Sequence, residues 1–301
     1  MRPTRVLLTV SVGTGALSAL AALLSAERAA AQYGLAASAA LVGYVLLARP
    51  AVPRARPALA AGVGLFAVLM VVRLWWLPEQ PADIRWMTPF YAPMDGGGAS
   101  MGPVQVPPTI LDQWRQAIDQ ERLAAVGLLL QVLCLAVAVI ALPVRRGSKG
   151  TWLAGVVAVL LLAVVGVNVW SRVDGAPLLG LLGAGWPALL ATLAAAGTLA
   201  LSGARADRAA LVPLGALLIA LSSAVILDDL TNIWSTWWRF TNSSDDAFLE
   251  AGVAVSAARS AGMSAVGWAD VSAALRTGMA LAGTALFAVG AVTASRDAEP
   301  V

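Results

Sequence analysis

The chain has no histidine, a single cysteine and a single lysine, and each scarcity excludes a kind of chemistry. Without imidazole, histidine-ligated haem, zinc or copper sites, His-based catalytic triads and histidine proton relays are excluded. Cys134 has no partner for an internal disulfide, and we expect it to fill space as a small apolar side chain. Lys149 lies in a basic loop, so a retinal-type Schiff base inside a span is excluded. No Walker sequence or nucleophile elbow occurs, and we expect no catalytic residue, no metal and no cofactor.

Charge is scarce as well, at 12% of residues, whereas 59% are hydrophobic and the mean hydropathy is +0.79. A soluble protein of this size could not bury so much apolar surface. Stretches of about 20 apolar residues, enough to cross roughly 30 Å of hydrocarbon as helix, predict about eight transmembrane helices. The expected spans are 5–25, 30–48, 58–77, 121–142, 151–170, 179–202, 209–227 and 272–293. No alternation typical of a transmembrane barrel occurs, so we predict an all-α polytopic integral membrane protein.

The positions of the basic residues predict the orientation of the chain. With both termini cytoplasmic, the inner segments hold eleven cations and three acids, a net charge of +8. The outer segments hold nine arginines and fourteen acids, a net charge of −5, which together give the overall +3. Every short basic loop thus agrees with the positive-inside rule. Because the basic residues are spread over five loops, the pI near 9.6 reflects topology, and we expect no nucleic-acid partner.

The N-terminus allows two interpretations that differ in the number of spans. Arg2 and Arg5, an apolar run and the small residues at 29–31 are typical of a secretory signal with a cleavage site, and cleavage would leave seven spans. The apolar run is, however, about 20 residues, longer than a usual signal core, which favours an uncleaved first span.

Two long polar segments divide the chain into halves of similar organisation, 1–150 and 151–301. An outer loop at 78–120 follows the third span, and a loop of equal length at 228–270 follows the seventh. Each return span is preceded by tryptophan with arginine eight positions later, Trp114 with Arg122 and Trp268 with Arg276. We hypothesise two parallel four-helix repeats from an ancient duplication. The alternative is that equal loop lengths are coincidence and that Trp with Arg is ordinary interface chemistry.

The first outer loop changes character along its length. It begins with turn-forming prolines and glycines, and beyond Pro108 apolar residues recur at helical spacing. We therefore predict an amphipathic helix that runs into the fourth span. The second loop is aromatic and polar at 232–240 before it becomes rich in small residues.

Ten of the eleven tryptophans fall on the outer side, and only Trp152 falls on the inner side. A one-sided aromatic belt at the headgroup layer is one explanation. The sharper hypothesis is an outward-facing site for a lipid, glycan or peptide, because indole faces stack on apolar and sugar surfaces. The residues of that predicted site are Trp75, Trp76, Trp86, Trp114, Trp234, Trp237, Trp238 and Trp268.

Ionisable residues are essentially missing from the span centres and gather at the outer ends. The predicted polar cluster consists of Arg73, Arg122, Asp228, Asp229 and Arg276, with Asp119, Glu121 and Asn168 close to it in the sequence pattern. Snorkelling arginines and helix-capping acids would explain this cluster without any function. The alternative is a functional polar site beneath the tryptophan-rich loops.

Three classes of function are compatible with these features. We expect first a non-enzymatic membrane subunit or binding protein whose extracytoplasmic loops dock a partner protein or lipid. A small-molecule or lipid transporter or flippase is the alternative, disfavoured by the lack of polar groups at the midplane. An enzyme acting on a lipid-linked substrate with Asp228 or Asp229 as base is the third. The abundance of Ala, Leu, Val and Arg suggests a bacterial origin, and we expect a multi-pass protein of the plasma (inner) membrane.

Overall fold

The computed structural model describes residues 3–24, 26–48, 55–76, 108–142, 149–172, 178–205, 210–242 and 268–296, and all structural statements concern these residues. They form eight helices and no strands, which confirms the predicted all-α class. The helices are α1 (Pro3–Leu23), α2 (Glu27–Ala48), α3 (Ala55–Trp76), α4 (Pro108–Ala141), α5 (Lys149–Arg172), α6 (Leu178–Arg205), α7 (Leu211–Asn242) and α9 (Trp268–Arg296).

Seven of the helices are long and apolar enough to cross a membrane. The third expected span, 58–77, lies in the eighth helix, α3, whose 22 residues include the apolar stretch Arg56–Val72. In hydrocarbon there is no water to bond exposed backbone groups, and helices satisfy these groups internally. The composition and the observed helices therefore agree on a polytopic membrane protein.

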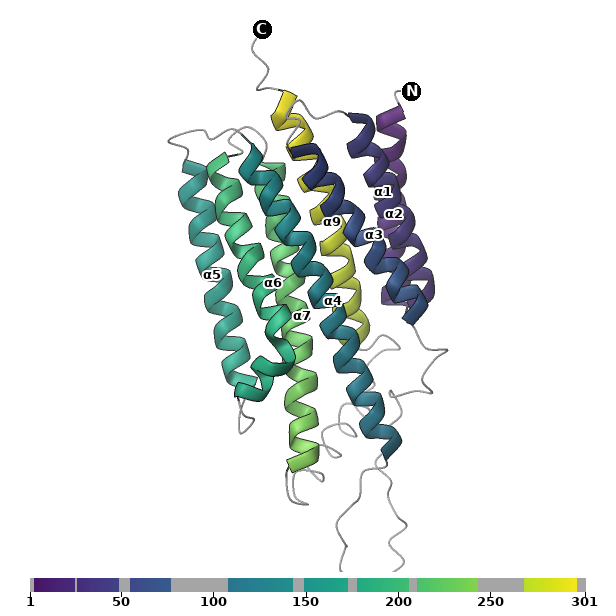
Figure 1. The fold of residues 1–301 in the computed structure, drawn as a ribbon, viewed down its shortest axis with the longest axis vertical. Coiled ribbons are helices and arrows are strands. Elements are labelled where there is room, and N and C mark those ends of the chain that lie inside the picture. Colours follow the sequence, from purple (N-terminus) through teal and green to yellow (C-terminus); the bar gives the residue numbers. More distant parts are fainter. Residues whose placement is uncertain are drawn as a thin grey trace, which may run out of the picture.

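The helices alternate in direction along the bundle (Figure 1). The start of α1 and the end of α9 lie at the same end of the bundle, which we call the terminal end, and the opposite end is the distal end. The distal end carries the end of α3, the start of α4, the end of α7 and the start of α9. Helices α4 and α7 extend furthest in that direction.

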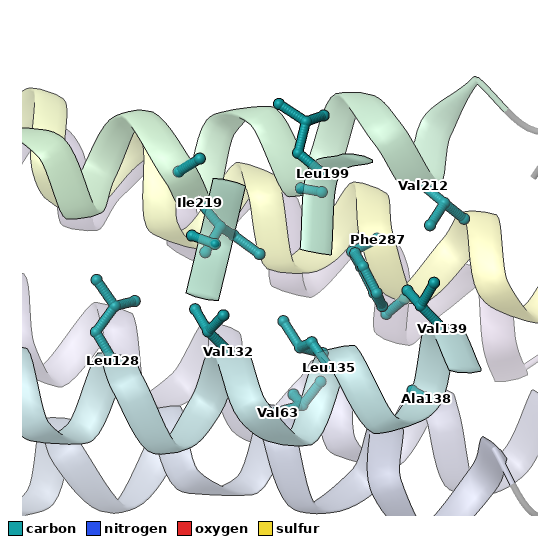
Figure 2. Packing of buried hydrophobic residues seen from close by; sticks show 14 of the residues in the cluster. Val63, Leu128, Val132, Leu135, Ala138, Val139, Leu199, Val212, Ile219 and Phe287 are labelled. Atoms are coloured by element: carbon teal, nitrogen blue, oxygen red, sulfur yellow. The ribbon is translucent and has the colours of Figure 1, made fainter. Parts of the chain in front are cut away.

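The centre of the bundle is an apolar layer between α4 on one side and α6, α7 and α9 on the other. Figure 2 shows this packing, with Leu128, Val132, Leu135 and Val139 of α4 opposite Leu199, Ile219 and Phe287. Val132, Leu135 and Phe287 are essentially inaccessible to solvent. The small gap that Val132, Leu135, Ile219 and Phe287 help to line is too narrow for a water molecule.

Helices α7 and α9 approach each other closely because glycines face neighbouring backbone. A Cβ atom at Gly283 would lie 2.9 Å from the carbonyl oxygen of Gly215 and 3.0 Å from the backbone nitrogen of Ile219. A Cβ atom at Gly290 would lie 2.8 Å from the backbone nitrogen of Val212. Small residues are used at such contacts in membranes because helix association depends on close packing.

Two helices are longer than their membrane spans. Helix α4 starts at Pro108 and continues without interruption into the span Glu121–Ala141, which confirms the helix predicted beyond Pro108. Helix α7 continues past the span Leu211–Thr231 to Asn242, so residues 232–240, expected within an outer loop, are helical. The segments 108–120 and 228–242 were expected in the outer loops 78–120 and 228–270. They are helical instead.

The proposed duplication stays a prediction, although the helix neighbours are compatible with it. Within each half, consecutive helices pack on one another, and the last helix of each half packs on the second helix of the other, α4 on α6 and α9 on α2. The extensive packing of α1 on α9 has no equally extensive counterpart between α5 and α4 among the described helices. The correspondence between the halves is thus partial.

We expect Gly283→Ala to lower the stability of the folded protein by about 1–3 kcal/mol, because the new methyl group meets backbone atoms of α7. Gly166→Ala is the matched control: its Cβ atom would meet nothing within 4 Å, and alanine favours helix. Thermal unfolding in detergent measures both variants. Equal midpoints for the two would show that the close approach of α7 and α9 is not required.

Candidate functional site

Arg276 of α9 is the centre of a polar network at the distal end. Its Nη1 atom donates to both carboxylate oxygens of Glu121 on α4, at 2.7 and 2.6 Å. The same nitrogen lies 3.7 Å from a carboxylate oxygen of Asp229 on α7. The side chains of Arg276 and Glu121 are only 13% and 18% exposed. One guanidinium thus joins three helices.

The backbone of Arg276 is held in addition to its side chain. The hydroxyl of Ser222 on α7 donates to the carbonyl oxygen of Arg276, at 3.0 Å. A carbonyl oxygen in a helix can accept this second hydrogen bond in addition to the one from its own helix, so the contact holds α9 against α7. The position of the guanidinium is therefore determined by both α4 and α7.

Asp228 and Asp229 are adjacent in α7 but face different partners. The side-chain amide of Asn168 on α5 donates to Asp228 at 2.8 Å, whereas Asp229 faces Arg276. Neighbouring positions on a helix point about 100° apart, which explains the divergence. The two carboxylates therefore link α7 to different helices and do not face one another as a general acid and base would.

Arg122 stands apart from this network. It lies 3.8 Å from Asp119, one turn earlier on the same helix, and both side chains are substantially exposed. Such a surface pair contributes little to stability. Of the predicted polar cluster, the structure thus brings Asp229 and Arg276 together and places Asp228 beside them on α7 with Asn168.

The remaining predicted residues lie partly or wholly outside the described part of the chain. The helices contain Arg73, Trp75, Trp76, Trp114, Trp234, Trp237, Trp238 and Trp268, but their side chains are not described, and Trp86 lies outside the described residues. All eight of these helical positions are at or near the distal ends of their helices.

Two exposed tryptophans on α5 are separated by about the depth expected for a membrane. Trp152 and Trp170 lie near opposite ends of α5 and are 74% and 75% exposed. Their separation along the helix is about 27 Å, close to the roughly 30 Å of a hydrocarbon core, and tryptophan favours both interfaces. Asn168 lies one half-turn inside Trp170, so the network of Arg276 is located near the distal interface.

A second polar contact joins α4 and α9 deeper in the bundle. Nε2 of Gln131 donates to the hydroxyl oxygen of Thr284 at 2.9 Å, and both side chains are buried. Gln131 lies ten residues from Glu121 along α4, which is roughly 15 Å and half the thickness of the hydrocarbon core. Gln131 was not predictable from hydropathy, because one amide hardly changes the hydropathy of a long apolar run.

The described residues do not bring together three His, Cys, Asp or Glu side chains that could hold a metal ion. The network joins α4, α7 and α9 through Arg276, and α5 to α7 through Asp228, at one end of the bundle.

Arg276→Gln should destabilise the protein by roughly 2–3 kcal/mol, because it leaves Glu121 without its largely buried cation. Arg122→Gln, in an exposed pair, should cost less than about 1 kcal/mol. Denaturant unfolding in mild detergent compares the two variants. If Arg122→Gln costs as much as Arg276→Gln, the network does not have the structural role that its burial indicates.

Comparison of the chain with protein-family models, with curated proteins and with solved structures gives no match. The function must therefore be inferred from the residues and their arrangement.

Proposed function

We propose that this chain is a non-enzymatic integral membrane subunit or binding protein that docks a partner protein or a lipid at the distal end of its bundle. The observation that carries the proposal is the length of α4 and α7, 34 and 32 residues, which exceeds the about 20 residues that cross the hydrocarbon core. The extensions 108–120 and 232–242 project by roughly 20 and 16 Å as helix. They contain Trp114, Trp234, Trp237 and Trp238, and tryptophan is enriched at protein–protein interfaces.

The network of Arg276 supports this proposal because it lies at the base of both extensions. Glu121 lies where the polar start of α4 meets its apolar run, and Asp229 lies where the apolar run of α7 gives way to polar and aromatic residues. Arg276 therefore fixes the two helices relative to each other where they leave the membrane. A preorganised surface binds with a smaller loss of conformational freedom than a flexible one.

The apolar packing at the centre of the bundle also favours docking over transport. A transporter needs a polar or hydrated path, whereas the gap beside Val132, Leu135 and Phe287 is too narrow for water. One observation favours the alternative of a small-molecule or lipid transporter, namely the polar contact of Gln131 with Thr284 at the midplane. An enzyme acting on a lipid-linked substrate receives no such support, because Asp228 and Asp229 face different partners.

We also propose that the protein resides in the plasma (inner) membrane of a bacterium, with both termini in the cytoplasm. The net charge of +8 on the inner segments, against −5 on the outer segments, supports this orientation. The distal end would then be extracytoplasmic, and its partners would be membrane lipids or proteins with domains at the outer face.

A green fluorescent protein fused after Val301 should fluoresce, because the C-terminus is expected in the cytoplasm, where this reporter folds. Alkaline phosphatase at the same position should be inactive, because it requires an oxidising compartment. Cell fluorescence and phosphatase activity check the orientation. The reverse pattern would place the distal end in the cytoplasm.

A photoreactive benzoylphenylalanine at position 237 or 238 should form a crosslink to a partner at the extracytoplasmic face, because both positions are on the α7 extension. The same residue at position 152, near the terminal end of α5, is the matched control and should crosslink only lipid. Immunoblots and mass spectra of irradiated cells identify the adducts. The same mixture of bulk lipids crosslinked at all three positions would instead indicate an aromatic belt.

A further inference from the structure

The terminal end of the bundle collects more positive charge than the chain itself can neutralise. Five segments of the chain begin or end helices here (Figure 1), namely 1–5, 49–56, 143–149, 205–210 and 296–301. Together they hold eleven cations and three acids. The carboxylates around Arg276 belong to the opposite end of the bundle. A net charge of +8 at the terminal end is therefore balanced by anions from outside the chain.

The charge is uneven around this end. The segments 143–149 and 205–210 hold five cations and one acid, a net charge of +4. They join α4 to α5 and α6 to α7, and α6 packs on α4, α5 and α7. The segments 1–5 and 296–301, at the ends of the mutually packed α1 and α9, hold three cations and two acids. The excess of positive charge is therefore greatest where α4, α5, α6 and α7 meet.

Two of these cations belong to adjacent helix ends, and each has an exposed leucine one turn away. Lys149 is the first residue of α5, and Leu153 follows four positions later. Arg205 is the last residue of α6, and Leu201 precedes it by four positions. Both leucines are exposed, and residues four apart lie on the same face of a helix. We call Lys149, Leu153, Leu201 and Arg205 the basic corner.

The basic corner borders lipid at the depth of the headgroups. Helix α5 has the lowest buried share of the seven spans, at 11%. Trp152, next to Leu153, is 74% exposed, and tryptophan favours the headgroup layer of a membrane. The junction of α2 and α3, which holds the other three cations, differs because Arg56 donates from Nη2 to the carbonyl oxygen of Leu46 at 2.9 Å. Cations at the headgroup layer above exposed apolar side chains match the two parts of a phospholipid.

We propose that the basic corner binds an anionic phospholipid. Its phosphate group binds between Lys149 and Arg205, and its acyl chains lie over Leu153 and Leu201. Arginine and lysine are the usual ligands of phosphate, and basic residues between membrane helices at one interface are typical of sites for anionic headgroups. A zwitterionic headgroup would leave the net charge of +4 unbalanced, so the site selects an anionic lipid. It lies at the opposite end from the proposed docking surface and does not depend on it.

The experiment compares the lipids next to the two ends of α5. The protein is reconstituted in nanodiscs of equimolar phosphatidylglycerol and phosphatidylethanolamine, so both leaflets have the same composition. Benzoylphenylalanine replaces Trp152 in one variant and Trp170 in another, two similarly exposed positions that share a face because 18 residues make five helical turns. After irradiation, intact mass spectra give the ratio of phosphatidylglycerol to phosphatidylethanolamine adducts. The ratio should be at least about fivefold higher at position 152, which is the effect of one cation near an anionic surface.

Removal of the two cations tests their part in the site. Lys149→Gln with Arg205→Gln should lower the ratio at position 152 to the ratio at the distal position. The matched control, Arg5→Gln with Arg296→Gln, removes the same charge from the same end of the bundle at α1 and α9 and should leave both ratios unchanged. If the first double variant does not fold, Lys149→Gln alone should lower the ratio, and Lys149→Arg should retain it.

Equal ratios at positions 152 and 170 in the folded protein would overturn the lipid site. An equal fall in the two double variants would also overturn it, because the charge of the whole end would then select the lipid without the basic corner. The position of the adduct distinguishes a lipid at the basic corner from one docked at the distal end, so the lipid site and the proposed docking are tested separately.

Discussion

Arg276 is charged near the membrane interface, and the organisation of the distal end depends on how that charge is satisfied. A guanidinium that is only 13% exposed needs carboxylates within the protein. Glu121 on α4 and Asp229 on α7 provide them. Since these residues lie where the two helices leave their spans, one charge determines how α4, α7 and α9 meet. Asn168 extends the same network to α5 through Asp228.

Hydropathy predicted the positions of the helices well, because backbone hydrogen bonding in lipid leaves a chain of this composition few other structures. The helix beyond Pro108 was predictable for a related reason, namely the helical spacing of its apolar residues. The end of α7 was not. Asn232, Ser235 and Thr236 are typical of a loop, but a helix that has already formed continues without a new nucleation cost.

The partners within the polar network were less predictable than its members. Sequence placed Asp228, Asp229 and Arg276 near one membrane interface, but which carboxylate faces which cation depends on helix rotation. Glu121 was known only as a residue beside the cluster, and it makes the shortest contact with Arg276. Gln131 was missed altogether, and it carries the unsatisfied acceptor of the described core. Both polar links join α4 to α9, the last helices of the two hypothesised halves.

The proposal that the distal end is a docking surface is tested most directly by a native mass spectrum of the chain, extracted from its own membrane in a mild detergent. Docking predicts a species heavier than the 30.8 kDa chain, with a second polypeptide or a retained lipid in fixed stoichiometry. A bare chain under the mildest conditions that release it from the membrane would contradict the proposal.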